Sequence, residues 1–382
     1  MPRTLRRRVE RRAVLAVSAA AALTVTGVLA ASSTTAAAKP AASPTTPPVR
    51  HVFVINLENK GYDQTFGPDS PAPYLTKTLT AKGQLLTQYH GTAHDSLPNY
   101  VAQISGQGPN PQTQEDCDVF SDFAQTGTVA PQQAVGEGCV YPAGVKTVAD
   151  QLEAKGLTWR GYMEDMGTPC RRPAPDAADD THKAKPGDQY AARHNPFMYF
   201  HSITDSPSCA ANDVDLSRLP TDLSTVATTR NLTYITPNLC NDAHDSPCVD
   251  GRPGGLVSAD RWLSTWIPKI LASPAYQKDG LLVVTFDEAD TDSHDGASAA
   301  ACCGEGPGPN SPLPGIDGMG GGRTGTVLLS RFLKPGTLNN TAYNHYSLLR
   351  TIENTFGVAP LGYAETARGF GHDVWGAGRA GR

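Results

Sequence analysis

Four short apolar runs, each followed directly by polar side chains, constrain the fold of this 382-residue chain more than any other feature. Continuous apolar runs of this length are typical of strands that are buried on both faces of a parallel sheet. The runs, each with the polar residues that follow it, are 52–57 with Glu58 and Asn59, 158–163 with Glu164 and Asp165, 232–236 with the segment 237–245, and 281–286 with Asp287 and Glu288.

Segments with helical spacing separate some of these runs. Residues 145–154 place Val145, Val148 and Leu152 on one face, and residues 256–271 have the same kind of apolar stripe. Strands that alternate with helices predict an α/β fold with a mostly parallel central sheet flanked by helices. Functional groups gather beyond the carboxyl ends of such strands, so we expect the four polar strand ends to converge on one site.

The N-terminal segment has the features of an export signal. Six arginines precede an apolar run over residues 13–31, and small residues suited to cleavage follow. We expect a signal peptide over 1–38, a flexible linker over 39–50 and a catalytic domain over 51–382 in a secreted protein. An uncleaved membrane anchor is the alternative reading. Residues 39–382 contain no further run of about 20 apolar residues, so we expect no transmembrane segment in the mature chain.

Charge and cysteine content narrow the possible partners. The chain has 32 basic and 37 acidic residues, and removal of six arginines and Glu10 with the signal leaves 26 and 36, a net charge of −10. Nucleic acid is therefore not an expected partner. The eight cysteines lack the paired spacing of a zinc ribbon, so we expect disulfides that staple long loops. Cys302 and Cys303 pair either with each other or with separate partners.

Ser96 is placed where a helix is expected to begin. Thr92 precedes it as a cap residue, and Pro98 follows in what would be the first turn. Free backbone N–H groups and the helix dipole at such a position suit a developing alkoxide and a bound phosphate. The alternative is that Ser96 is a simple N-cap.

Hydrolysis of a phosphate monoester is too slow without catalysis for a helix end alone to accelerate it sufficiently. The strand-end residues Glu58, Asn59, Asp287 and Glu288 supply the hard oxygen ligands that divalent metal ions prefer, with the Ser96 oxygen as a further ligand. Each carboxylate taken singly is also consistent with a strand-end cap or a solvated loop residue. Together they predict a site for one or two divalent metal ions of unknown identity.

Three further polar residues are candidates for the same site. Asp242, His244 and His345 either complete a second metal position or contact phosphate oxygens and assist the leaving group. For a single histidine, an ordinary hydrogen-bonding role is equally expected, and we expect that role for His294. His294 lies in the Gly- and Pro-rich stretch 289–322, a long loop that could act as a lid.

Several segments of the chain together resemble the motifs of a known family. The chain resembles the bacterial and fungal phosphoesterase family that contains secreted acid phosphatases and phospholipases C, and its serine segment is similar to that of the acid-phosphatase branch. The matching segments follow one another in order from about residue 52 to 353. They are 52–67, 94–100, 193–197, 237–238 with 241–245, 285–288 and 343–353.

The resemblance implies an alkaline-phosphatase-like fold and a phosphoserine intermediate on Ser96. It implies metal binding by Glu58, Asn59, Ser96, Asp287 and Glu288. It also implies that histidines at matching positions lie near the phosphate, so we expect His94, His244 and His345 as catalytic residues. The expected substrate contacts are Asn99, His194 and Asp242.

Two departures qualify these expectations. Sulfatases, a related group, have an arginine where this chain has Tyr100, so sulfatase activity is not expected. Asn59 and Glu288 are atypical for a two-zinc alkaline phosphatase, which leaves the number of metal ions open. The sequence predicts a secreted phosphomonoesterase that acts on a small phosphate ester or a lipid headgroup, such as a phosphoinositide. The alternatives are a phospholipase C or other phosphodiesterase, and a catalytically inactive secreted binding protein.

Overall fold

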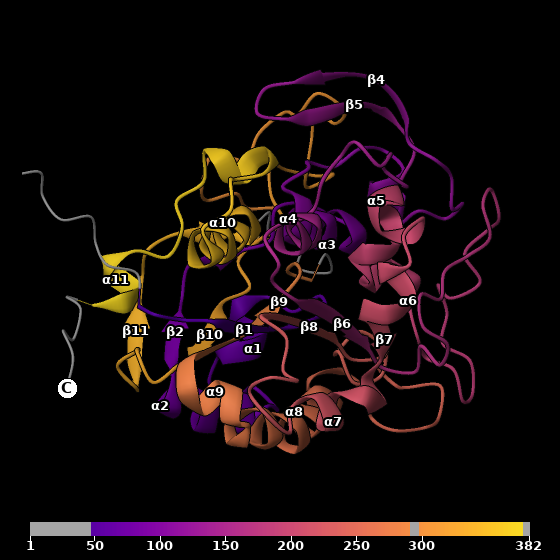
Figure 1. Cartoon of the computed structure of the whole chain (residues 1–382). Helices are drawn as coiled ribbons and strands as arrows, with labels where there is room; N and C mark the ends of the chain where they lie inside the picture. Colours follow the sequence, from indigo (N-terminus) through magenta and orange to yellow (C-terminus); the bar gives the residue numbers. More distant parts are fainter. Residues whose placement is uncertain (1–46, 291–297, 377–382) are drawn as a thin grey trace, which may run out of the picture. The chain divides into compact units, whose positions relative to one another are not determined.

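The computed structural model describes residues 47–290 and 298–376, which all lie within the unit Pro44–Arg382 (Figure 1). The strands are β1 (His51–Leu57), β2 (Gln84–Leu86), β3 (Tyr89–His90), β4 (Ala124–Val129), β5 (Gln133–Glu137), β6 (Trp159–Met163), β7 (Asp213–Asp215), β8 (Leu232–Thr236), β9 (Gly280–Phe286), β10 (Thr326–Leu329), β11 (Thr337–Asn339) and β12 (Tyr343–Asn344). The α-helices are α1 (Tyr62–Phe66), α2 (Thr80–Lys82), α3 (Ser96–Ser105), α4 (Val148–Ala154), α5 (His201–Thr204), α6 (Ser208–Asn212), α7 (Leu219–Asp222), α8 (Gly255–Ala272), α9 (Pro274–Asp279), α10 (His345–Phe356) and α11 (His372–Trp375).

A large central sheet organises the described residues. Its strand order is β11-β2-β10-β9-β1-β8-β6-β7, and every neighbouring pair is parallel except the two that involve β10. The four apolar runs of the sequence form the neighbouring strands β9, β1, β8 and β6. Because these strands run in the same direction, their carboxyl ends lie at one edge of the sheet, as the sequence predicted.

Strand β1 shows why its run is continuously apolar. Val52 and Val54 pack into one hydrophobic cluster, whereas Phe53, Ile55 and Leu57 pack into another. Alternate side chains of a strand point to opposite faces, so both faces of the sheet at β1 are covered. The central strand is therefore buried on both sides.

Helices form a layer on each face of the sheet (Figure 1). Helices α3, α4 and α10 contribute to the cluster that contains Val52, and α8 contributes Leu263, Ile267 and Ile270 to the cluster that contains Phe53. This layering confirms the predicted α/β architecture.

The predicted helices match the observed ones, with small shifts of their boundaries. Helix α4 begins at Val148 and not at Val145, because Thr147 is its N-cap and accepts a hydrogen bond from the Asp150 N–H. Helix α8 spans Gly255–Ala272 and contains Pro268. Helix α3 begins at Ser96, the position the sequence predicted.

All eight cysteines are paired. The disulfides are Cys117–Cys139, Cys170–Cys209, Cys240–Cys248 and Cys302–Cys303. Cys302 and Cys303 thus pair with each other, and none of the eight sulfurs is a free thiolate ligand.

Some of the expectations fall outside the described ranges. The proposed signal peptide, most of the linker and His294 lie among residues that the structure does not describe. Within 47–290 and 298–376, none of the helices combines the length and apolar character needed to cross a bilayer.

Candidate active site at the carboxyl edge of the sheet

Backbone pairing brings the polar strand ends together. Leu57 of β1 is in register with Phe286 of β9, so Glu58 and Asp287 follow at neighbouring positions. The Asp287 N–H donates to the Leu57 carbonyl over 2.9 Å, and the Glu58 N–H donates to the Asp242 carbonyl over 2.8 Å. Residues far apart in the sequence are therefore joined by backbone hydrogen bonds at the end of the sheet.

Ser96 lies at the first position of α3 and is almost completely buried. Its Oγ donates to Oε2 of Glu58 over 2.9 Å and lies 3.5 Å from Oδ1 of Asn59. The hydroxyl therefore faces the strand ends of the sheet. The alternative that Ser96 is an N-cap does not describe this geometry, because Ser96 is inside the helix and Asp95 is the cap residue.

The start of α3 differs from the expectation that its backbone N–H groups are free. The Leu97 N–H donates to Oδ1 of Asp116 over 2.8 Å, so this backbone donor is not free for a phosphate. Asp116 directly precedes the loop closed by the Cys117–Cys139 disulfide. A carboxylate at a helix N-terminus is stabilised by the unpaired N–H groups and the dipole there, and Asp116 takes that position from a separate segment of the chain.

Six residues form what we call the serine cluster: Glu58, Asn59, Ser96, His194, Asp242 and Asp287. The Asn59 N–H donates to Oδ1 of Asp287 over 2.9 Å. One end of the Asn59 side-chain amide lies 3.2 and 3.3 Å from the two Asp287 carboxylate oxygens and 3.0 Å from Oε2 of Glu58. These contacts are hydrogen bonds when the amide nitrogen occupies that end. When the amide oxygen occupies it, several acceptor oxygens converge, an arrangement that suits a bound cation.

His194 lies between two carboxylates of the cluster. Its Nε2 is 3.3 Å from Oε2 of Glu58, and its Nδ1 is 3.2 Å from Oδ2 of Asp242. One ligand atom from each of Glu58, His194 and Asp242 lies within 4.8 Å of the other two. Tyr100 adds a further contact, since its hydroxyl donates to Oε1 of Glu58.

Burial perturbs the protonation of the cluster. Desolvation raises the pKa of Glu58 well above its usual value, and the charges of Asp287 and Asp242 raise it further. Desolvation also raises the pKa of Asp242, and it raises the pKa of Asp287 to about 6. Burial together with the Arg193 charge lowers the pKa of His194. Three buried carboxylates at one place are costly unless a positive charge balances them.

The donor set fits a divalent cation. Carboxylate, amide and hydroxyl oxygens from Glu58, Asn59, Ser96 and Asp287 are hard ligands, and His194 supplies a nitrogen. A cation among them would satisfy the converging oxygens and balance the charge of the carboxylates. Four of the five residues expected to bind metal therefore lie together.

Glu288, the fifth, belongs to a second group beside the serine cluster. Its Oε2 is hydrogen-bonded to Nδ1 of His94, and the Asn99 amide nitrogen lies 3.4 Å from the same oxygen. His94 also contacts the Ser298 carbonyl through Nε2 at 2.7 Å. Asn99 accepts from the N–H groups of Thr92 and Ala93, so its amide ties the loop before Ser96 to α3.

His345 lies against the backbone of the cluster. Its Nε2 contacts the Asp287 carbonyl, and its Nδ1 lies 3.1 Å from the Tyr89 hydroxyl. Burial lowers the pKa of His345 to about 4. The imidazole is therefore neutral at physiological pH, and both of its nitrogens are engaged.

His244 flanks the cluster on the side of Asp242. Its Nδ1 lies 2.8 Å from Oδ1 of Asp245, and its Nε2 lies 3.2 Å from Nη2 of Arg193. The His244 side chain is 31% exposed, whereas His94 and His194 are each 2% exposed. Among the predicted site histidines, His244 is thus the one most open to solvent.

Sequence reasoning missed three residues of the site. Tyr100 lies one helical turn after Ser96, and that spacing could have indicated a shared face. Arg193 is buried, and its Nε lies 3.2 Å from Oδ2 of Asp116. Nothing local marks Asp116, because only the tertiary fold brings it to α3.

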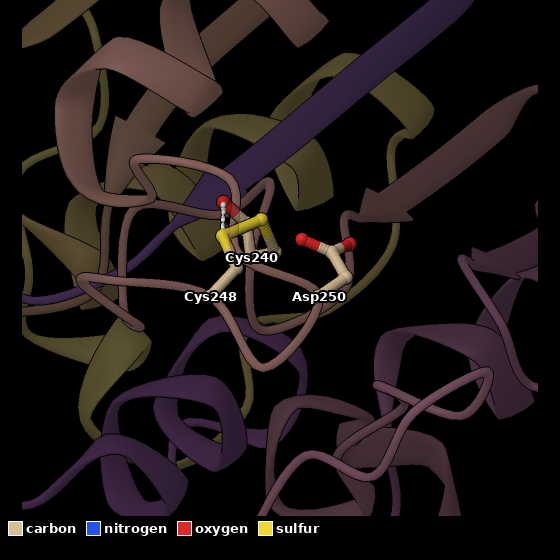
Figure 2. Close-up of side chains that lie close together, drawn as sticks. All are labelled: Cys240, Cys248 and Asp250. Atoms are coloured by element: carbon tan, nitrogen blue, oxygen red, sulfur yellow. Dashed lines mark hydrogen bonds between the residues drawn. A yellow bond between two sulfur atoms is a disulfide. The ribbon is translucent and has the colours of Figure 1, made fainter.

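A disulfide brackets the segment that carries Asp242 and His244. Cys240 and Cys248 are eight positions apart and close a short loop around these residues (Figure 2). The Asp250 carboxylate lies near the two sulfurs, but it pairs with Arg252 at 2.7 Å. Because both sulfurs are in the disulfide, this group stabilises the loop and offers no thiolate to a metal.

Among solved structures, a protein of the alkaline phosphatase superfamily from Vibrio parahaemolyticus is similar to this chain. The TM-score is 0.48 at 12% identity, and the likeness covers 83% of this chain and 69% of that one.

Similar known sequences and a family match show the family of this chain. The phosphate-repressible acid phosphatase of Penicillium chrysogenum is 27% identical over 80% of this chain and 58% of its own length, so the chain spans a little over half of that relative. The phosphatidylinositol-3-phosphatase of Mycobacterium tuberculosis is 26% identical over 86% of this chain and 84% of its own length. The model of the phosphoesterase family matches residues 69–359, which is most of the chain, and the chain therefore belongs to the phosphoesterase family.

Proposed function

We propose that this protein is a secreted, metal-assisted phosphomonoesterase that acts through a phosphoserine intermediate on Ser96. The observation that carries the proposal is the position of Ser96. It is the first residue of α3, and its hydroxyl donates to Glu58 within a cluster of buried carboxylates. A hydroxyl held beside an acceptor is the arrangement that nucleophilic catalysis requires.

The residues of the serine cluster have different roles in the proposed reaction. Glu58 Oε2, 2.9 Å from Ser96 Oγ, is the acceptor toward which the hydroxyl proton is directed during attack on phosphorus. A divalent cation bound by these oxygens would lower the pKa of the hydroxyl and offset the charge of the phosphate. Water then cleaves the phosphoserine and releases phosphate.

Two histidines beside the serine cluster have separate roles in the proposed reaction. His244 is partly exposed, and in its protonated form, with Nε2 turned from Arg193 to the substrate, it transfers a proton to the leaving oxygen. His345 contacts the Asp287 backbone and so acts as a positioning residue.

The relatives favour a monoester substrate. The fungal relatives are named acid phosphatases, and the mycobacterial relative is named a phosphatidylinositol-3-phosphatase. Both names describe a phosphatase, so we propose a phosphate monoester as the substrate, with a phosphoinositide headgroup as one candidate. The four disulfides and the N-terminal arginine-rich, apolar segment support export to an oxidising compartment.

Replacement of Ser96 tests the proposal. Ser96→Ala should lower the hydrolysis of p-nitrophenyl phosphate at least about a thousandfold, since a covalent route needs the nucleophile. The matched control is Ser105→Ala, which removes a buried hydroxyl from the other end of α3 that bonds the Val101 carbonyl. Ser105→Ala should retain activity within about threefold of wild type.

Other outcomes separate the alternatives. Activity above a tenth of wild type in Ser96→Ala would remove Ser96 from the nucleophilic role. Faster hydrolysis of bis(p-nitrophenyl) phosphate than of the monoester would identify a phosphodiesterase. Inactivity of the wild type on both esters with every divalent ion would favour the binding protein.

A further inference from the structure

Tyr100 and Ser96 hold the two oxygens of one carboxylate. The Tyr100 hydroxyl donates to Oε1 of Glu58, and the Ser96 hydroxyl donates to Oε2 over 2.9 Å. Residues four apart in a helix lie on the same face, so α3 presents both hydroxyls to Glu58. Rotation of a carboxylate about its last bond is otherwise nearly free. The two hydroxyls therefore fix the orientation of the Glu58 carboxylate.

The Tyr100 ring also fixes His194. The two rings are stacked with centroids 5.4 Å apart and an interplanar angle of 5°. Both side chains are buried, which leaves the His194 ring little freedom to turn. The stack holds Nε2 of His194 3.3 Å from Oε2 of Glu58.

We propose that Tyr100 is a positioning residue that orients Glu58 and His194 toward the cation and toward Ser96. This inference rests on the proposed function, because it assigns Tyr100 a task within the same site. Partners that orient metal ligands typically contribute about 10–100-fold in metal affinity or activity. Tyr100 thus sets how tightly the cluster holds its cation and how fast Ser96 reacts.

Tyr100→Phe tests the inference because it removes one oxygen and retains the ring. Calorimetry on chelator-treated protein should show about 10–100-fold weaker binding of the divalent ion that restores wild-type activity, chosen from Mg²⁺, Mn²⁺, Ca²⁺ and Zn²⁺. At saturating metal, kcat should fall by about tenfold while KM changes by less than about twofold.

Tyr234→Phe is the matched control. Tyr234 is buried beside Tyr100 at a centroid distance of 6.5 Å, but its hydroxyl donates to Gln103 over 2.9 Å and not to Glu58. Tyr234→Phe should lower the thermal stability about as much as Tyr100→Phe does, and it should keep the wild-type metal affinity. Incorporation of 3-fluorotyrosine at position 100 retains the hydroxyl, so this variant should restore affinity and kcat.

The outcomes distinguish the two proposals. Metal affinity and kcat of Tyr100→Phe within about twofold of wild type would overturn the role of Tyr100 and leave the proposed function intact. Equal loss of affinity in Tyr100→Phe and Tyr234→Phe would reduce Tyr100 to a packing residue. A wild type that no divalent ion activates would overturn both proposals together.

Discussion

Glu58 shows how one buried side chain takes its role from its neighbours. It is fully buried, yet both of its oxygens are engaged, by the hydroxyls of Ser96 and Tyr100. The nearby charge of Asp287 raises the pKa of Glu58 further above the value that burial gives it. An ionised pair of carboxylates at this depth is costly, so a cation is the expected partner of Glu58 and Asp287.

Loss of either carboxylate should release the cation. Glu58→Gln and Asp287→Asn should each lower the metal content of the purified protein and the activity together, by at least about tenfold in activity. Metal analysis of each variant, measured beside its rate of monoester hydrolysis, checks this expectation.

Glu164→Gln is the control for both variants. Glu164 also follows a parallel strand of the sheet, but it accepts hydrogen bonds from Asn238 and Asn241 outside the serine cluster. Its replacement should leave metal content unchanged. Full metal occupancy in both Glu58→Gln and Asp287→Asn would place the ion elsewhere.

At the scale of elements, disulfides hold the loops that carry site residues. Cys240–Cys248 closes the loop of Asp242 and His244 across eight positions, whereas Cys170–Cys209 spans 39. In the chain-entropy model, these crosslinks stabilise the fold by about 2.5 and about 3.9 kcal/mol. The shorter crosslink contributes less to stability but lies at the site.

Removal of these two disulfides, one at a time, should therefore affect stability and activity to different degrees. Replacing Cys240 and Cys248 with serine should lower kcat by about tenfold, because Asp242 and His244 lose their fixed loop. Replacing Cys170 and Cys209 should lower the unfolding temperature more and kcat less. Thermal unfolding and steady-state kinetics on both double variants check the ranking, and the reverse ranking would contradict it.

For the whole molecule, much of the architecture could be predicted because it depends on local patterns. Apolar runs predicted β1, β6, β8 and β9, and the direction of parallel strands predicted that the polar ends of β1, β8 and β9 would meet. The end of β6 does not join them, because Glu164 accepts hydrogen bonds from Asn238 and Asn241 outside the serine cluster. The start of α3 at Ser96 could also be predicted from Pro98. The remainder depends on long-range packing: Asp116 reaches α3 from a separate loop, and Glu288 turns toward His94 and not into the serine cluster.

The stereochemistry of phosphoryl transfer tests whether Ser96 forms a phosphoserine intermediate. Each in-line displacement at phosphorus inverts its configuration, so attack by Ser96 followed by attack by water should give net retention with a phosphorothioate monoester that oxygen isotopes make chiral at phosphorus. Direct attack by water would invert the configuration once. Net retention is expected for a phosphoserine intermediate on Ser96, and net inversion would contradict that intermediate.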